Sequence, residues 1–193
     1  MIVKFLAPAA VTGLLLSAIV GAAPAAAQQA GLAADSSFIV TASSLGLLQV
    51  KLGKMAQEKG SGASVKDFGK RMVDEYSQTN QKLAAGAKQA AFPSPVLLRP
   101  HRIVLDRFSK MGGSSFDKDY MAEMVKEYDD AVRLFQEEAK DGRVASLKQL
   151  ASSLLPTMQQ HLALATQTAG SVGADVTAST TGERQESERR GSK

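Results

Sequence analysis

The feature that most constrains the fold is a five-residue pattern, M-V-x-E-Y, which occurs at residues 72–76 and again at residues 124–128. Around each copy, apolar and aromatic residues recur at steps of four, four, three and four, which keeps them on one face of an α-helix. These positions are Phe68, Met72, Tyr76, Thr79 and Leu83 in the first copy, and Tyr120, Met124, Tyr128, Ala131 and Phe135 in the second. Two helices with matched faces predict a bundle built from two related halves.

The spacing of apolar residues and of turn signals predicts four long helices. We expect them at about residues 36–59, 64–90, 116–140 and 144–168, with a short helical pattern in the connector at residues 96–110. Strand patterns are nearly absent, so the expected fold class is all-α. The connector is long enough for the third helix to lie either next to the second helix or across the bundle from it.

Polar residues before the helices are candidate N-caps, because their side chains can accept hydrogen bonds from first-turn amides. The candidates are Asp35, Ser36 and Ser37 for the first helix, Ser64 for the second, and Ser114 or Ser115 for the third. Pro156 lies inside the fourth helix and predicts a kink there.

Residues 1–27 have the form of a secretory signal peptide, with Lys4 before an apolar run and small residues up to Ala27. We expect cleavage near Ala27 and therefore an exported protein, periplasmic or secreted. No segment after the leader is expected to span a membrane. Residues 35–169 form the predicted bundle domain, and the polar residues 170–193 are a predicted disordered tail.

Composition excludes several classes of site. The chain has no cysteine, which excludes disulfides and thiolate metal ligands, and its net charge of +4 is too small and dispersed to argue for nucleic acid. The most basic stretch is the connector around His101. Its cations are Arg99, Arg102, Arg107 and Lys110. We favour a solvated connector here over a weak contact with an anionic membrane surface, which stays open as an alternative.

Each long helix carries one polar residue near the middle of its apolar face. These residues are Gln49, Tyr76, Tyr128 and His161. Because midpoints of antiparallel helices fall at similar depth, we expect one central layer. Our preferred interpretation is a hydrogen-bonded core layer in which the tyrosine hydroxyls and the Gln49 amide satisfy His161.

A metal or redox site in the core is the alternative interpretation of the same layer. His161 is the only histidine on these apolar faces. Glu75 and Glu127 each precede a tyrosine and are rotated about 100° off the face, so we expect them to flank the layer and to face solvent or basic neighbours. Met72, Met124 and Met158 are interpreted as core filling.

Several short pieces of sequence occur together in a characteristic order. They are Phe38, L-G-K-M-A at 52–56, M-V at 72–73, F-D-K-D-Y at 116–120, A-V-R-L-F at 131–135, and L-P at 155–156 followed by H-L at 161–162. Over residues 35–168 the chain resembles a bacterial family of exported domains of unknown function, often labelled predicted outer membrane proteins. The resemblance implies a ferritin-like antiparallel four-helix bundle, with a short extra helix in the connector between helices 2 and 3.

The resemblance also implies a glutamate at position 49 and histidines at positions 76, 128 and 161, of which this chain keeps only His161. We therefore expect a non-catalytic, periplasmic or envelope-associated binding or stress-related protein with a degenerate ligand layer, without a cofactor and with unknown partners. The alternative is an iron- or manganese-binding or oxidoreductase-like protein that uses His161 with Tyr76, Tyr128, Glu75 and Glu127.

Overall fold

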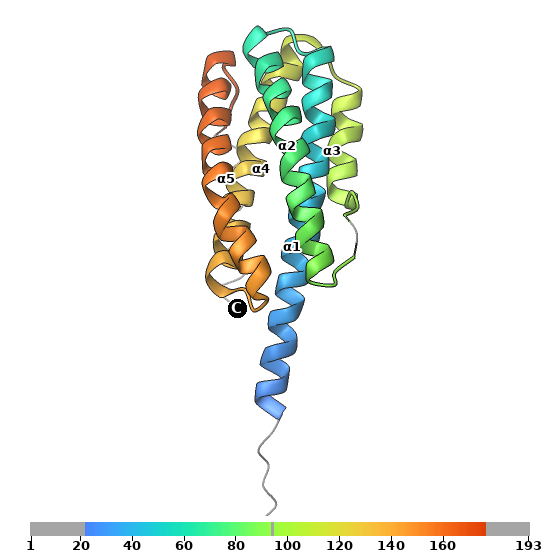
Figure 1. Ribbon diagram of the computed structural model, residues 1–193. Helices are drawn as coiled ribbons and strands as arrows, with labels where there is room; N and C mark the ends of the chain where they lie inside the picture. Colours follow the sequence, from blue (N-terminus) through green and yellow to red (C-terminus); the bar gives the residue numbers. More distant parts are fainter. Residues whose placement is uncertain (1–21, 94, 177–193) are drawn as a thin grey trace, which may run out of the picture.

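The structure, a computed structural model, describes residues 22–93 and 95–176, with side chains from Gly31 onward. Within these residues it contains helices and turns but no strand, which confirms the all-α prediction. The helices are α1 (Ala22–Lys59), α2 (Ala63–Gln89), α3 (Arg99–Ser109), α4 (Gly113–Asp141) and α5 (Ala145–Val172), shown in Figure 1. The short helix expected in the connector is α3.

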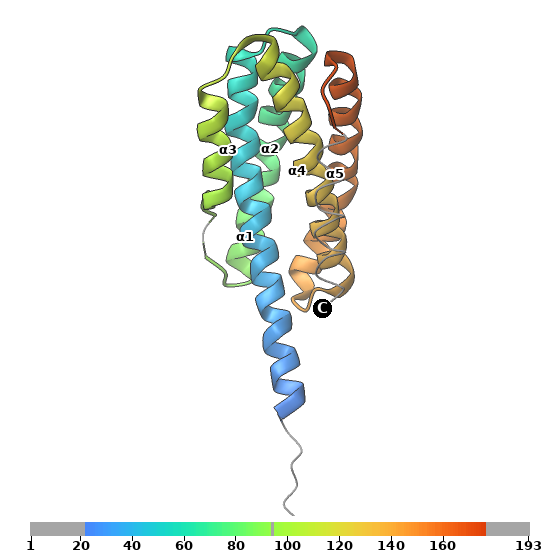
Figure 2. The same ribbon diagram turned by 180° about the vertical axis from the view of Figure 1, so that it is seen from behind.

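The four long helices form two antiparallel hairpins, α1 with α2 and α4 with α5. The hairpins meet where α1 packs against α4 and α2 packs against α5, while α3 packs on α1 (Figure 2). Helix α3 carries the chain back along the bundle, so α2 and α4 lie on a diagonal and run in the same direction. The connector is therefore a crossover, the second of the two placements that its length allows.

Two helix ends differ from the predicted positions. Helix α1 begins at Ala22 rather than near residue 36, and its first turns project beyond the bundle in Figure 1. Helix α5 continues to Val172, and Ala174 and Val176 pack against the core, so the first part of the predicted disordered tail is ordered. Residues 1–21 of the predicted signal peptide and residues 177–193 of the predicted tail lie outside the described residues.

Helix α1 is also apolar over much of its length. By length and composition, its segment Gly31–Lys59 is capable of crossing a membrane, which differs from the expectation that no such segment follows the leader. Half of its most apolar window is buried inside the bundle, and both buried core helices and signal sequences near an N-terminus meet the same criteria of length and composition.

A pair of glycines brings α1 and α2 close together. A Cβ atom on Gly53 would lie 2.6 Å from the carbonyl oxygen of Gly69, and a Cβ atom on Gly69 would lie 2.7 Å from that of Gly53. Neither contact is possible for a larger residue without moving the backbone, so the glycines set the separation of the first hairpin.

Aromatic side chains fill the core near the turn between α1 and α2. Phe116 stacks on Tyr120 with ring centroids 5.5 Å apart, and Phe108 of α3 meets Phe116 edge-to-face at 5.6 Å. Edge-to-face and offset contacts of this kind stabilise the pair beyond simple area burial. Through Phe108, the short helix α3 becomes part of the core, which fixes its position against α1 and α4.

Buried Asp117 ties α4 to the turn of the opposite hairpin. Its carboxylate accepts hydrogen bonds from the backbone N–H groups of Ser61 (3.0 Å) and Gly62 (2.7 Å), and from the Ser61 hydroxyl (2.6 Å). These amides precede α2 and have no partner within that helix. A carboxylate at this helix N-terminus also interacts favourably with the helix dipole.

Asp35 makes the equivalent contact at the other end of the bundle. Its carboxylate accepts hydrogen bonds from the N–H groups of Arg143 (3.0 Å) and Val144 (2.7 Å), just before α5. Asp117 lies 82 positions after Asp35, and the same offset carries Ser61 and Gly62 onto Arg143 and Val144. We call these two contacts the aspartate clamps. By the positions of the aspartate clamps, the hairpin of α1 and α2 corresponds to the hairpin of α4 and α5. The M-V-x-E-Y repeat gives a different correspondence, between α2 and α4.

At α2, the aspartate clamp of Asp117 takes the place of the local cap that the sequence predicts. The N-cap residues of α2 and α4 are Gly62 and Gly112, and neither helix has a side-chain cap. Ser64 therefore does not cap α2, and the Ser115 hydroxyl donates to the carbonyl oxygen of Gly112 instead of capping α4. Asp35 lies inside the continuous helix α1 rather than at its start.

The first testable prediction concerns the aspartate clamps. The substitution Asp117→Ala leaves the amides of Ser61 and Gly62 without their acceptor, so we expect the free energy of unfolding to fall by about 2–3 kcal/mol. Urea unfolding measures this change. The matched control is Asp119→Ala, an exposed carboxylate on the same helix, for which we expect a change within about 0.5 kcal/mol. An equal fall in the free energy of unfolding in both variants would show that the clamp contributes nothing to stability.

Candidate functional site

The four residues of the predicted central layer are all buried, one from each long helix. The rings of three of them meet. The centroid of His161 lies 5.5 Å from that of Tyr76 and 5.2 Å from that of Tyr128, and the two tyrosine rings are 6.5 Å apart. Gln49 is fully buried, but its amide nitrogen and oxygen have no hydrogen-bond partner among the described residues.

The hydrogen bonds of this layer differ from those expected. The Tyr128 hydroxyl donates to the sulfur of Met72 at 2.7 Å, and the Tyr76 hydroxyl donates to that of Met158 at 3.5 Å. The tyrosines and Gln49 therefore do not satisfy His161 as the sequence interpretation proposed. Burial raises the pKa of both phenols above its ordinary value, so both are neutral at neutral pH.

His161 finds its partner at the edge of the layer. Its Nε2 lies 2.5 Å from Oε2 of Glu75, whose other oxygen accepts a hydrogen bond from Arg71 at 2.6 Å. Burial opposes the charge on Glu75, but the hydrogen bonds from His161 and Arg71 outweigh it and lower the pKa of the carboxyl. Glu75 thus faces a basic neighbour, as expected, and also reaches inward.

The remaining nitrogen of His161 has no partner in the part of the chain that the structure describes. Burial lowers the pKa of this imidazole despite the opposing effect of Glu75, which favours the neutral ring. With Nε2–H directed at the carboxylate, Nδ1 is an acceptor that lies buried without a donor among the described residues.

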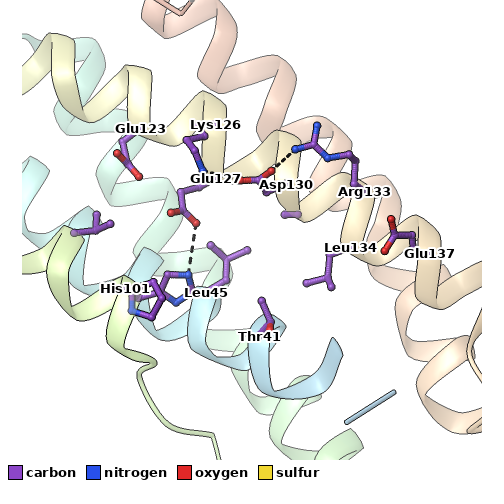
Figure 3. Close-up of a pocket in the computed structure, with 13 residues that line it drawn as sticks. Thr41, Leu45, His101, Glu123, Lys126, Glu127, Asp130, Arg133, Leu134 and Glu137 are labelled. Atoms are coloured by element: carbon purple, nitrogen blue, oxygen red, sulfur yellow. Dashed lines mark hydrogen bonds and ion pairs between the residues drawn. The ribbon is translucent and has the colours of Figure 1, made fainter. Parts of the chain in front are cut away.

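A surface pocket of about 510 Å³ lies between α1, α3 and α4 (Figure 3). Its apolar lining includes Leu45, Val104 and Leu134. Charged residues of α4 line the opposite side, and His101 of α3 points toward them. The pocket therefore combines an apolar wall with a charged wall, the composition usual for small-molecule sites.

His101 is held by a fixed chain of contacts. The backbone N–H of Leu98 donates to the Ser44 hydroxyl at 2.8 Å, and that hydroxyl lies 2.6 Å from Nδ1 of His101. Donation by Ser44 to Nδ1 uses the hydroxyl proton and leaves the imidazole proton on Nε2. Nε2 lies 3.7 Å from Oε2 of Glu127, so this proton faces the carboxyl group. We call these residues the Ser44–His101–Glu127 chain.

Two sequence interpretations hold only in part at this chain. His101 is buried, whereas the cations of the connector are exposed, as expected of a solvated connector. These cations are Arg99, Arg102, Arg107 and Lys110. Glu127 faces a basic neighbour, His101, but its side chain is only 12% exposed and does not face solvent. Burial, followed by the charge of Glu123, raises the pKa of Glu127 to about 7, and burial lowers the pKa of His101. Perturbed groups that share a cleft are candidates for a functional site.

The sequence did contain a signal for His101. His101, Val104 and Phe108 are spaced three and four residues apart, which places the imidazole on the inward face of a short helix. The four basic residues around His101 hid this signal, because they suggested that the whole stretch is solvated. Two of those cations are paired, Arg107 with Glu123 and Lys110 with Asp106, which weakens the proposed membrane contact.

No group of three or more histidine, aspartate or glutamate side chains in the described residues converges so as to hold a metal ion. His161 with Glu75 and His101 with Glu127 are separate acid–histidine pairs on different helices. Each pair could contribute two ligands at most from its own side chains, whereas the usual protein sites use three or four.

Comparison with known proteins identifies a family but no characterised relative. A family model described as "Domain of unknown function (DUF4142)" matches residues 20–168 of the chain. No curated protein and no solved structure matches.

The second testable prediction concerns Glu127. Its folded-state pKa of about 7 lies above the ordinary 4.5, so its contribution to stability is present below pH 4.5 and is lost as the pH rises through about 7. Glu127→Gln removes this loss. Between pH 4.5 and pH 7, we expect the free energy of unfolding of the variant to rise relative to that of the native protein by an amount on the order of 3 kcal/mol.

Urea unfolding at a series of pH values measures this difference. The exposed Glu58 on α1 provides the control Glu58→Gln, whose pH profile should follow that of the native protein. Parallel profiles for Glu127→Gln and the native protein would show that the Glu127 carboxyl titrates normally.

Proposed function

The chain belongs to the DUF4142 family, and we propose that it acts as a non-catalytic binding protein whose ligand site is the pocket between α1, α3 and α4. On this proposal the protein works after export, in the periplasm or at the cell envelope. Its ferritin-like bundle serves as a rigid scaffold, and its central layer serves as core.

The observation that carries the proposal is the Ser44–His101–Glu127 chain. A serine, an imidazole and a carboxyl from α1, α3 and α4 are brought together at the edge of an open cavity. Such positioned polar groups beside an apolar wall fix the orientation of a ligand at low entropic cost.

The geometry supports binding better than catalysis. The Ser44 hydroxyl is fully buried and already occupied by Leu98 and His101, so it is not placed to attack a substrate. Glu127 reaches His101 only at 3.7 Å, longer than a hydrogen bond. The chain therefore positions a carboxyl group at the pocket rather than activating a nucleophile.

A second candidate function is favoured by the free Nδ1 of His161. Metal-ligating histidines commonly donate their other ring N–H to a carboxylate, and His161 makes that contact with Glu75. Iron or manganese held by Nδ1, with help from Tyr76 or Tyr128, would make the protein a metal-binding or oxidoreductase-like member of its family. The raised pKa of both phenols opposes this, because a metal would have to displace a proton from each tyrosine that it bound.

The third prediction tests the pocket. Thr41 lines it, and Thr41→Phe fills part of its volume without changing a charge. In a thermal-shift panel of small cations, anions and neutral metabolites, we expect at least one chemical class to raise Tm of the native protein. The same class should leave Thr41→Phe unshifted and should stabilise the control Thr166→Phe, an exposed position on α5. A panel without any shift specific to the open pocket would refute the proposed function.

The fourth prediction separates the two candidates. We expect the protein, purified without chelator or a metal-carrying affinity tag, to contain less than stoichiometric iron and manganese by mass spectrometry. A full equivalent of either metal that is lost in His161→Ala, but kept in His101→Ala, would establish the central layer as a metal site. That result would replace the binding proposal with the metal-binding one.

A further inference from the structure

A second pocket extends the first one along α4. It has a volume of about 490 Å³ and lies between the early part of α1 and the C-terminal turns of α4. Leu134 and Glu137 line both pockets. Figure 3 shows these two residues at the end of the first pocket away from His101. The two cavities therefore form one elongated depression, which we call the α1–α4 groove.

The α1–α4 groove is acidic although the protein as a whole is basic. Among the residues that the structure describes, seven carboxylate residues line it, against three lysine or arginine residues. The carboxylates are Asp35, Glu123, Glu127, Asp130, Glu137, Glu138 and Asp141. The net charge of the whole chain is +4, so this excess of negative charge is local. A concave surface of one charge sign concentrates ligands of the opposite sign.

Glu138 provides an observation independent of the charge count. It lines the groove, is only 5% exposed, and its Oε1 has no hydrogen-bond partner among the described residues. Burial, together with the nearby charge of Asp35, raises the pKa of this carboxyl to about 7. A buried carboxyl without a donor is costly, and a cationic ligand that donates a hydrogen bond to it removes that cost.

The spacing of the acids indicates an elongated ligand. Glu127 and Glu138 are eleven residues apart on α4, which corresponds to roughly 17 Å along a helix. Asp130 and Glu137 lie between them, and so does the apolar side chain of Leu134. Charged positions therefore alternate with an apolar surface along the length of the groove.

From this arrangement we propose that the α1–α4 groove binds a linear polyamine, a chain of ammonium groups separated by methylene segments. The ammonium groups pair with Glu127 near His101 and with Glu138 at the other end, and the methylenes lie against Leu134 and the apolar wall. The proposal deepens the proposed function, on which it rests, by naming the ligand class.

A linear organic cation fits better than a divalent metal ion. The acids are spread along the groove, and no three of them converge in the described residues. The two Asp35 oxygens are already acceptors for the Arg143 and Val144 amides. An ammonium group needs only one or two acceptors, and methylene segments gain from the apolar wall.

Isothermal titration calorimetry at low ionic strength tests the proposal with four probes: butylamine, 1,4-diaminobutane, spermidine and spermine. We expect saturable binding of one spermine per chain, with affinity falling as amine groups are removed. Glu127→Gln and Glu138→Gln should each weaken spermine binding about tenfold, the effect of losing one charged contact. The control Glu58→Gln removes an exposed carboxylate outside the groove and should bind as the native protein does.

Three results would overturn the inference. They are the absence of saturable binding up to about 1 mM spermine, equal affinity of all three variants, and binding of butylamine or Mg²⁺ as tight as that of spermine. If polyamines fail while another chemical class stabilises the native protein but not Thr41→Phe, the binding function stands and only the ligand class is wrong.

Discussion

Two buried aspartates fix the position of the two hairpins relative to each other along the bundle axis. Asp35 accepts backbone hydrogen bonds from the turn before α5, and Asp117 accepts them from the turn before α2. The aspartate clamps lie at opposite ends of the α1–α4 interface. A shift of either hairpin along the bundle axis would therefore break both clamps. They therefore set the depth at which Tyr76, Tyr128 and His161 meet. They also fix the two walls of the α1–α4 groove, of which Asp35 is itself a lining residue.

This constraint divides the molecule into a closed core and an open groove. In the core, the tyrosine hydroxyls donate to methionine sulfurs and Nε2 of His161 pairs with Glu75. The Gln49 amide and Nδ1 of His161 have no partner among the described residues, and neither side chain lines the α1–α4 groove. Along the groove, the carboxyl groups of Glu127 and Glu138 are largely buried. Among the described residues, Glu127 has the imidazole of His101 at 3.7 Å, and Oε1 of Glu138 has no hydrogen-bond partner. Burial of an unpaired acid raises its pKa and stores binding free energy that a cation can recover. The proposed function rests on these two carboxyl groups because they line an open groove.

Sequence periodicity predicted the parts of this structure that depend on local spacing. The apolar faces, the short helix in the connector and the burial of Gln49, Tyr76, Tyr128 and His161 follow from side chains three and four residues apart. The caps were not predictable, because the acceptors for the amides before α2 and α5 lie 55 or more residues away. The burial of Glu127 was missed for the same kind of reason. It depends on the crossover that places α3 and His101 against α4, and no local pattern encodes that path.

The central claim is that ligands bind in the groove and that the central layer is structural. The chain has two histidines, His101 in the groove and His161 in the core, so imidazole ¹⁵N resonances report on each place separately. The most direct measurement is a nitrogen-detected NMR titration of the full chain, without a histidine tag, with spermine. The account predicts that the His101 ring nitrogens shift and saturate while those of His161 stay in place. Shifts confined to His161 would contradict it and would locate the working site in the core.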